Sequence, residues 1–172
     1  INFDQGDSGN GIAAYDNVMP TAWEEPHGAG ISGGVKTVLG SGSSNNVMYT
    51  TPTVFGTSMA LTYAHDYGTT DTADKTTSAT EDESGRSYDL TMKINPSLGT
   101  EILSGLNLYA GASTIETHGN SSVTDDDQYE AVGAVTYALG PVEVGIMVSG
   151  MYNGENTNLT TNHSYKNSAF GV

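Results

Sequence analysis

Acidic side chains are crowded into the first part of the chain, where no basic residue accompanies them. The sequence has no Lys or Arg before Lys36, and five carboxylates precede it: Asp4, Asp7, Asp16, Glu24 and Glu25. Carboxylates that line a narrow passage with low-dielectric walls concentrate cations and repel anions more strongly than carboxylates in bulk water. The segment therefore has the composition of a cation-attracting surface. The competing interpretation is a solvated acidic loop without such a role.

Calcium is a second interpretation of some of these carboxylates. Asp4 and Asp7 have a spacing compatible with Ca²⁺, which needs several oxygen ligands, but the Asp-x-Asp-x-Asp-Gly register of calcium loops is absent. The acidic runs 81–83 and 125–127 could also hold divalent cations, although charge runs are usually only solvated. We expect no metal site and no cofactor, with Ca²⁺ as the minor alternative.

Cysteine chemistry, metal-ligand spacing and a basic nucleic-acid-binding surface are missing from the sequence. The chain has no Cys, and its four histidines are scattered without the spacing of metal ligands: His27, His65, His118 and His163. Five Lys and Arg against twenty Asp and Glu give a formal charge of −15, which repels a polyphosphate. We expect neither an enzyme nor a nucleic-acid-binding protein.

The composition and the residue alternation predict an all-β chain. Only 36% of the residues are hydrophobic, whereas Gly, Tyr, Thr, Ser and Asn are abundant, so a helical bundle is disfavoured. Segment 86–95 shows the period-2 pattern of a strand, with Tyr88, Leu90, Met92 and Ile94 on one face and Ser87, Asp89, Thr91 and Lys93 on the other. Charged residues on polar strand faces predict a water-facing side; these are Asp89, Lys93, Glu130 and Glu143.

The connections between the predicted strands alternate in length. We expect six or seven strands, at 46–51, 57–66, 86–95, 102–117, 128–139, 142–152 and from 165 onward. Between them, the short connections 52–56, 96–101 and 140–141 alternate with the long ones 67–85, 118–127 and 153–164. In an antiparallel meander this rhythm collects all short turns at one end of the sheet.

Such asymmetry is typical of membrane β-barrels, whose strands of about ten residues face lipid on one side and water on the other. No apolar run reaches the ~18 residues of a spanning helix. Tyrosines near strand ends fit an interfacial aromatic girdle, although ordinary β-propensity explains them equally well; they are Tyr63, Tyr129, Tyr137, Tyr152 and Tyr165. Segment 4–34 is too long for a hairpin loop and too apolar for a linker, so we expect it to pack against something.

Residues 45–56, Asn-Asn-Val-Met-Tyr-Thr-Thr-Pro-Thr-Val-Phe-Gly, followed by Ala60, Leu61 and Tyr63, resemble the trimeric outer-membrane porins of Gram-negative bacteria. In that family a similar strand follows a long third loop that folds inward and narrows the channel. The resemblance implies an antiparallel meander forming part of a 16-stranded transmembrane β-barrel, with 4–34 as the constriction loop and 1–3 as the end of the preceding strand. Two departures are Met48, where many members carry Arg, and Phe55 directly before Gly56.

Under this resemblance, residues 1–172 form a single barrel portion of a longer chain, with 1–45 the strand end and constriction loop and 46–172 the antiparallel strands. The implied function is passive diffusion of small hydrophilic solutes through a water-filled pore, with a weak cation preference from the loop carboxylates. The implied partners are the lipid bilayer, solutes and cations, and two further copies in a homotrimer of the outer membrane.

The alternative is a structural or adhesive cell-surface β protein, such as a surface-layer or fibre subunit, that uses its acidic loops for Ca²⁺ or partner contacts. The discriminating feature is the environment of the apolar strand faces. They would meet in a dry core between two layers in a sandwich, and would point toward lipid in a barrel.

Overall fold

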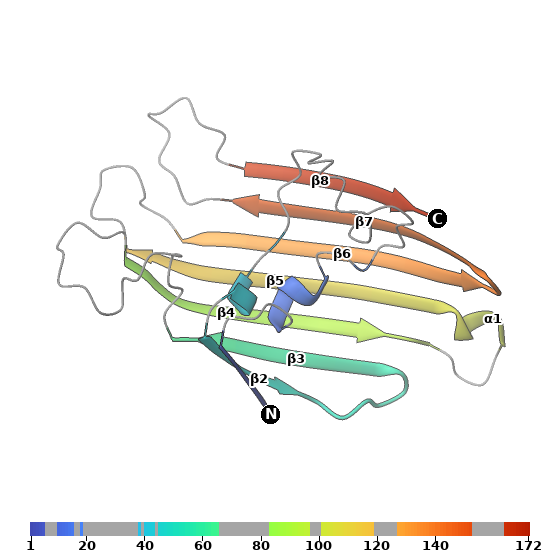
Figure 1. The fold of residues 1–172 in the computed structure, drawn as a ribbon, viewed down its shortest axis with the longest axis horizontal. Coiled ribbons are helices and arrows are strands. Elements are labelled where there is room, and N and C mark those ends of the chain that lie inside the picture. Colours follow the sequence, from blue (N-terminus) through green and yellow to red (C-terminus); the bar gives the residue numbers. More distant parts are fainter. Residues whose placement is uncertain are drawn as a thin grey trace.

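The structure is a computed structural model that describes residues 1–5, 10–15, 18, 38, 40–43, 45–65, 83–96, 101–118, 127–152 and 164–172. These residues form one antiparallel sheet whose eight strands follow one another in sequence order (Figure 1). The strands are β1 Asn2–Gln5, β2 Asn45–Thr50, β3 Thr57–Ala64, β4 Glu83–Ile94, β5 Leu106–His118, β6 Gln128–Leu139, β7 Val142–Tyr152 and β8 Ser164–Gly171. The prediction of an all-β antiparallel meander is confirmed. The sheet is open, with β1 and β8 at its edges.

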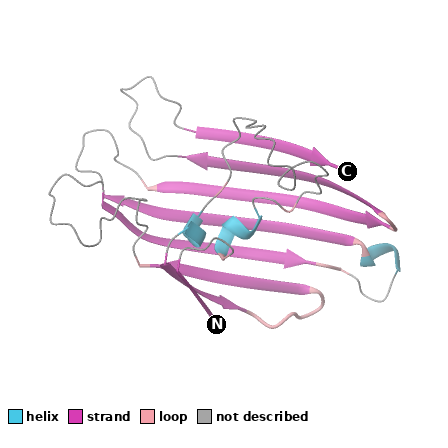
Figure 2. Cartoon of the chain, viewed as in Figure 1, coloured by secondary structure: helices cyan, strands magenta, loops and turns pink. Residues whose placement is uncertain are grey.

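Within the described ranges, three short helical turns accompany the sheet. The 3-10 turns η1 (Gly11–Tyr15) and η3 (Gly40–Ser43) lie over the middle strands, and α1 (Glu101–Ser104) lies in the connection between β4 and β5 (Figure 2). Among the described residues, no helix is long and apolar enough to cross a membrane.

Most strand predictions agree closely with the structure because the period-2 pattern is a local signal. The ranges predicted for β6 and β7 coincide with the observed strands. β5 begins at Leu106, four residues later than predicted, because residues 101–104 form a helical turn instead. The Asn95 side-chain amide donates to the carbonyls of Ser104 and Leu106, at 3.3 and 3.1 Å, and so satisfies backbone acceptors at the end of this turn.

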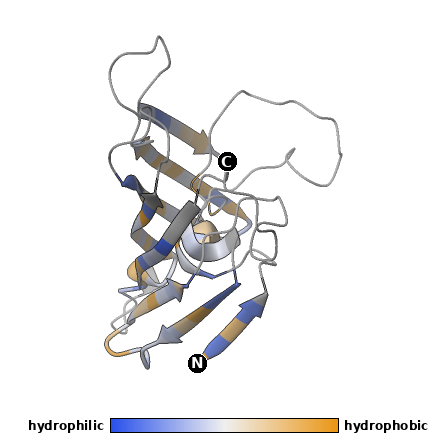
Figure 3. Ribbon diagram, turned by 90° about the vertical axis from the view of Figure 1, so that its left-hand side faces the viewer, coloured by the Kyte–Doolittle hydropathy of each residue, from blue (hydrophilic) through white to orange (hydrophobic). Residues whose placement is uncertain are grey.

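The two faces of the sheet have opposite exposure. We call the face beneath η1 and η3 the covered face and the other the open face. Among the residues that the structure describes, ten buried ones are polar or charged. Those on the strands lie on the covered face: Asn46, Thr62, Ser87, Asp89, Thr91, Ser113, Glu130 and Thr136. The open face instead exposes large apolar side chains, including Leu61, Leu90, Val135, Ile146, Val148 and Phe170. The resulting alternation of hydrophilic and hydrophobic residues is visible along the strands in Figure 3.

Tyrosines form a row across the open face near the long connections. The strand register aligns Tyr63 with Tyr88 and Tyr129 with Tyr152, and the ring centroids of the two pairs are 5.2 and 6.4 Å apart. Thr114 of β5 stands between the pairs. Tyr165 does not belong to this row, because its partner Met151 places it on the covered face.

Candidate functional site

The covered face is the candidate site, because there a distant part of the chain is fixed onto the sheet. Asp89, in the middle of β4, has no exposed surface. Its carboxylate accepts hydrogen bonds from the backbone N–H of Ile12 (2.8 Å) and of Ser41 (3.0 Å), and from the hydroxyls of Ser41 (2.8 Å) and Ser113 (2.7 Å). One carboxylate therefore binds both 3-10 turns to two neighbouring strands.

The two backbone donors lie in the first turns of η1 and η3. The first N–H groups of a helical turn have no partner within the turn, and a carboxylate is a strong acceptor for them. Ile12 and Ser41 are the second residues of their turns. The Asp89 carboxylate thus serves as the hydrogen-bond acceptor for a backbone N–H group in each of the two turns.

Glu130 of β6, on the strand next to Ser113, also accepts a hydrogen bond from the backbone of η3, as Asp89 does. It is 2% exposed, and its Oε2 accepts the backbone N–H of Gly40 at 2.8 Å, while its Oε1 accepts the side-chain amide of Gln128 at 2.7 Å. The register pairs Asp89 with Ser113 and Ser113 with Glu130, so the two carboxylates lie in one row across β4, β5 and β6.

A chain of amides extends the contact to β1 and β2. The Asn2 amide donates to Asn10 at 3.0 Å, the Asn10 amide donates to Asn46 at 2.8 Å, and the Asn46 amide donates to the Ser41 carbonyl at 3.2 Å. Together with Asp89, Ser113 and Glu130, these residues form what we call the anchoring network. It holds residues 10–12 and 40–41 against five strands.

Glycines allow the backbone to approach the carboxylate this closely. Gly11 and Gly40 have φ angles of 63° and 48°, in the left-handed region that favours glycine. A Cβ added at Gly11 would lie 2.0 Å from Asp89 Oδ2, and one added at Gly40 would lie 2.5 Å from the same oxygen. Both positions therefore require the absence of a side chain.

The described apolar contacts between the turns and the sheet centre on one small cluster. The buried cluster consists of Ile12, Val38, Val132, Ala134 and Met147. A Cβ at Gly111 would lie 3.1 Å from Ile12 and 3.3 Å from Val132, so a glycine in β5 makes room for this cluster. Hydrogen bonds to buried carboxylates consequently carry much of the attachment.

A second group of side chains borders the attached turns. The rings of Tyr15 and Tyr109 meet edge to face with centroids 5.3 Å apart, and Lys93 Nζ lies 5.4 Å from the centroid of the Tyr109 ring. Burial raises the pKa of the Tyr15 hydroxyl above its usual value of 10.0, and a hydrogen bond with Thr91 partly offsets this effect. Lys93 itself is exposed.

The predicted site residues fall into four groups. Asp4 lies on the covered face, in register with Asn46, whereas Asp7, Asp16, Glu24 and Glu25 lie outside the described residues. Lys93 and Glu143 are exposed on the covered face. Asp89 and Glu130 also lie on the covered face, where the turns bury both carboxylates.

The sequence did not reveal Asn10, Ser41 and Ser113 as members of the site. Each is a common polar residue in a loop or strand, without a motif around it. The available signal was a carboxylate in the centre of a strand, on its polar face, and it identified Asp89 without its partners. Among the described residues, no group of three or more His, Cys, Asp or Glu is arranged to hold a metal ion.

The anchoring network is suited to holding a segment in place rather than to chemical turnover, because the carboxylate oxygens of Asp89 are occupied by backbone and hydroxyl donors.

Comparisons of the chain with protein-family models, with curated proteins and with solved structures find no match.

Proposed function

We propose that this chain is the central part of a passive diffusion channel for small hydrophilic solutes in the outer membrane of a Gram-negative bacterium. One observation carries the proposal: the sheet buries carboxylates such as Asp89 and Glu130 while it exposes Leu61, Leu90 and Ile146. A sheet of a water-soluble protein has the opposite polarity, since its apolar face packs in the core. Exposed apolar residues on one face and polar residues on the other suit a wall between lipid and a water-filled lumen.

The height of the apolar face agrees with this environment. On β6 the open face runs from Tyr129 to Leu139, about 34 Å at ~3.4 Å per residue. With the strand tilt of about 40° that is usual in membrane barrels, this length corresponds to about 26 Å along the membrane normal, close to the apolar band of about 25 Å in such proteins. The tyrosine row at the long-connection end would lie at the level of the lipid headgroups.

The covered face would line the lumen, and the attached turns would narrow it. A segment inside a pore must be fixed, because a mobile one would block the flow intermittently. The anchoring network provides such a fixation. The weak cation preference would come from the acidic first segment, namely Asp4, Asp7, Asp16, Glu24 and Glu25, with exposed Lys93 opposing it and exposed Glu143 supporting it.

The two edge strands support a larger assembly. β1 and β8 each present one row of backbone groups without a strand partner among the described residues. Such edges are stable in a membrane only when further strands close the barrel. In this proposal the remaining strands of a 16-stranded barrel come from a longer chain, and three barrels form the trimer.

Conductance measurements test the proposal. The full-length protein, purified in detergent, is added to a planar bilayer, and current steps and the reversal potential in a salt gradient are recorded. We expect discrete steps and a reversal potential displaced toward the cation equilibrium value. A protein that is soluble without detergent and gives no current steps would overturn the proposal and favour the surface-layer or fibre alternative.

A further inference from the structure

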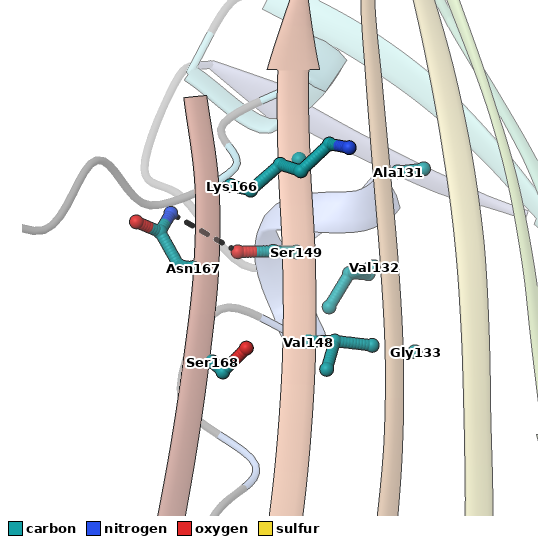
Figure 4. A pocket seen from close by; sticks show the side chains of 9 residues that line it. Ala131, Val132, Gly133, Val148, Ser149, Lys166, Asn167 and Ser168 are labelled. Carbon is teal, nitrogen blue, oxygen red and sulfur yellow. Dashed lines mark hydrogen bonds between the residues drawn. The ribbon is translucent and has the colours of Figure 1, made fainter. Parts of the chain in front are cut away.

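The open face is hollowed over β6, β7 and β8, where several outward positions have small side chains. The hollow has a volume of about 510 Å³ (Figure 4). Its outward-facing lining residues are Ala131, Gly133, Val148, Gly150, Lys166 and Ser168. The hollow exists because Ala131, Gly133 and Gly150 have small side chains or none, and its floor is apolar because these residues bring no polar side-chain atoms.

Lys166 stands at one end of this hollow. It is exposed on β8, its register partner on β7 is Gly150, and its side chain extends across β7 toward Ala131 (Figure 4). The missing side chain at Gly150 leaves room for this path. Within the described part of the chain, no acidic side chain forms an ion pair with Lys166; the ion pair of the open face joins Arg86 and Glu116 at 3.1 Å.

A lysine in this position needs an anionic partner. On a face in contact with lipid, an ammonium group without a counter-charge is costly. Lys166 lies one outward row from Tyr152, about 7 Å along the strand, so its ammonium can reach the headgroup level. The hydroxyls of Ser164 and Ser168 flank it on the same edge and can also donate to an anion.

We propose that the hollow binds an acyl chain of an anionic lipid and that Lys166 pairs with its phosphate group. The inference rests on the proposed function, because it requires the open face to lie in a membrane. Charge favours a lipid over a second copy of this chain. Between the tyrosine row and Leu139, the described open face carries no carboxylate, so another open face packed here would bring no counter-charge to Lys166.

Native mass spectrometry of the full-length protein in detergent tests the binding, with phosphatidylglycerol as the anionic probe and phosphatidylcholine as the zwitterionic one. We expect preferential retention of phosphatidylglycerol. Lys166→Gln should lower its retention about five-fold, the effect of roughly one lysine near an anionic headgroup, and should leave phosphatidylcholine unchanged. Lys166→Arg should restore the preference.

Two further variants separate the parts of the site. Gly133→Leu should lower the retention of both lipids by filling the hollow, and a Cβ at this position meets no atom closer than 3.9 Å, so the strand tolerates it. Lys93→Gln removes the same charge from the covered face and should leave lipid retention unchanged. Excess inorganic phosphate should not displace the lipid, since it lacks the acyl chain.

Equal retention of phosphatidylglycerol by wild type and Lys166→Gln would overturn the inference, as would an equal loss in Lys93→Gln or displacement by free phosphate. Pairing of copies through the open face would also overturn it. Such pairing would be seen as a mass increase that Gly133→Leu abolishes, in a protein that shows no lipid preference. Conductance recorded in parallel separates the two proposals. Channel steps without lipid preference refute only this inference, and lipid preference without channel steps refutes only the proposed function.

Discussion

The Asp89→Ala variant removes one of the two carboxylates that hold the turns against the sheet, and leaves the Glu130 bond to Gly40 in η3. The Ser41 hydroxyl can turn to Ser87, whose Oγ lies 2.8 Å away, but the backbone N–H groups of Ile12 and Ser41 cannot turn. Leaving a buried donor without a partner costs about 1–3 kcal/mol, so two such donors correspond to about 2–6 kcal/mol of lost attachment. The strand ladders stay intact, and we therefore expect local detachment of the turns rather than unfolding of the sheet.

Amide hydrogen exchange of the full-length protein in detergent measures this loss. At 2 kcal/mol, the lower end of the range, the exchange of the Ile12 and Ser41 amides should accelerate about 30-fold, while the amides of β6 and β7 should be unaffected. In the proposed channel, the same variant should show noisier current in bilayers, because the detached segment would fluctuate in the lumen. Asp89→Asn, which keeps the shape and one carbonyl oxygen, should have an intermediate effect.

Glu143→Ala is the matched control, because Glu143 is an exposed carboxylate on the same face. It should leave the exchange of both amides as in wild type. Unchanged protection of Ile12 and Ser41 in Asp89→Ala would refute the reasoning, since the apolar contacts of Ile12 would then suffice to hold the turns.

Three further variants test other parts of the covered face. Gly11→Ala should weaken the attachment of η1 by about 1–3 kcal/mol, seen as faster amide exchange at residue 12, whereas Gly140→Ala, at φ 62° with no atom within 4 Å of the added Cβ, should leave that exchange unchanged. Because the pKa of Tyr15 is raised in the folded state, the neutral Tyr15 hydroxyl contributes fully to the stability of the fold below pH 10.0, and this contribution is lost as the pH rises through the folded pKa. Ultraviolet titration should therefore show a tyrosine that ionises late, and Tyr15→Phe should remove this signal. Lys93→Glu should shift the reversal potential further toward the cation value, and an unchanged value would place Lys93 away from the ion path.

The strands could be predicted from the sequence because their signal is local. The alternation of apolar and polar residues in 128–139 and 142–152 depends only on neighbouring residues, and both ranges match the structure. The helical turn at 101–104 was missed because it depends on Asn95, which lies across the connection and binds its carbonyls.

The anchoring network could not be predicted because its donors are mainly backbone groups, which every residue other than proline possesses. Asp89 is 77 positions from Ile12 and 48 from Ser41, and Glu130 is 90 positions from Gly40. Strand alternation placed Asp89 and Glu130 on the polar face but could not show that a distant segment covers them. The glycines needed at 11 and 40 are also ordinary in a chain with 22 of them.

The polarity of the sheet explains why carboxylates hold the segment. In the proposed channel the covered face is also the wall of a water-filled lumen, so it could not carry a broad apolar patch, because the part beyond the segment would have to stay wetted. Among the described residues, apolar anchoring comes from the small cluster around Ile12, and buried carboxylates supply strong polar contacts beside it. Charge-assisted hydrogen bonds are roughly twice as strong as neutral ones, and their burial beneath the turns protects them from competing water. The acidic residues of this chain thus serve two different physical purposes: Asp89 and Glu130 hold the backbone in place, and in our proposal exposed carboxylates such as Glu143 act on the ions that pass.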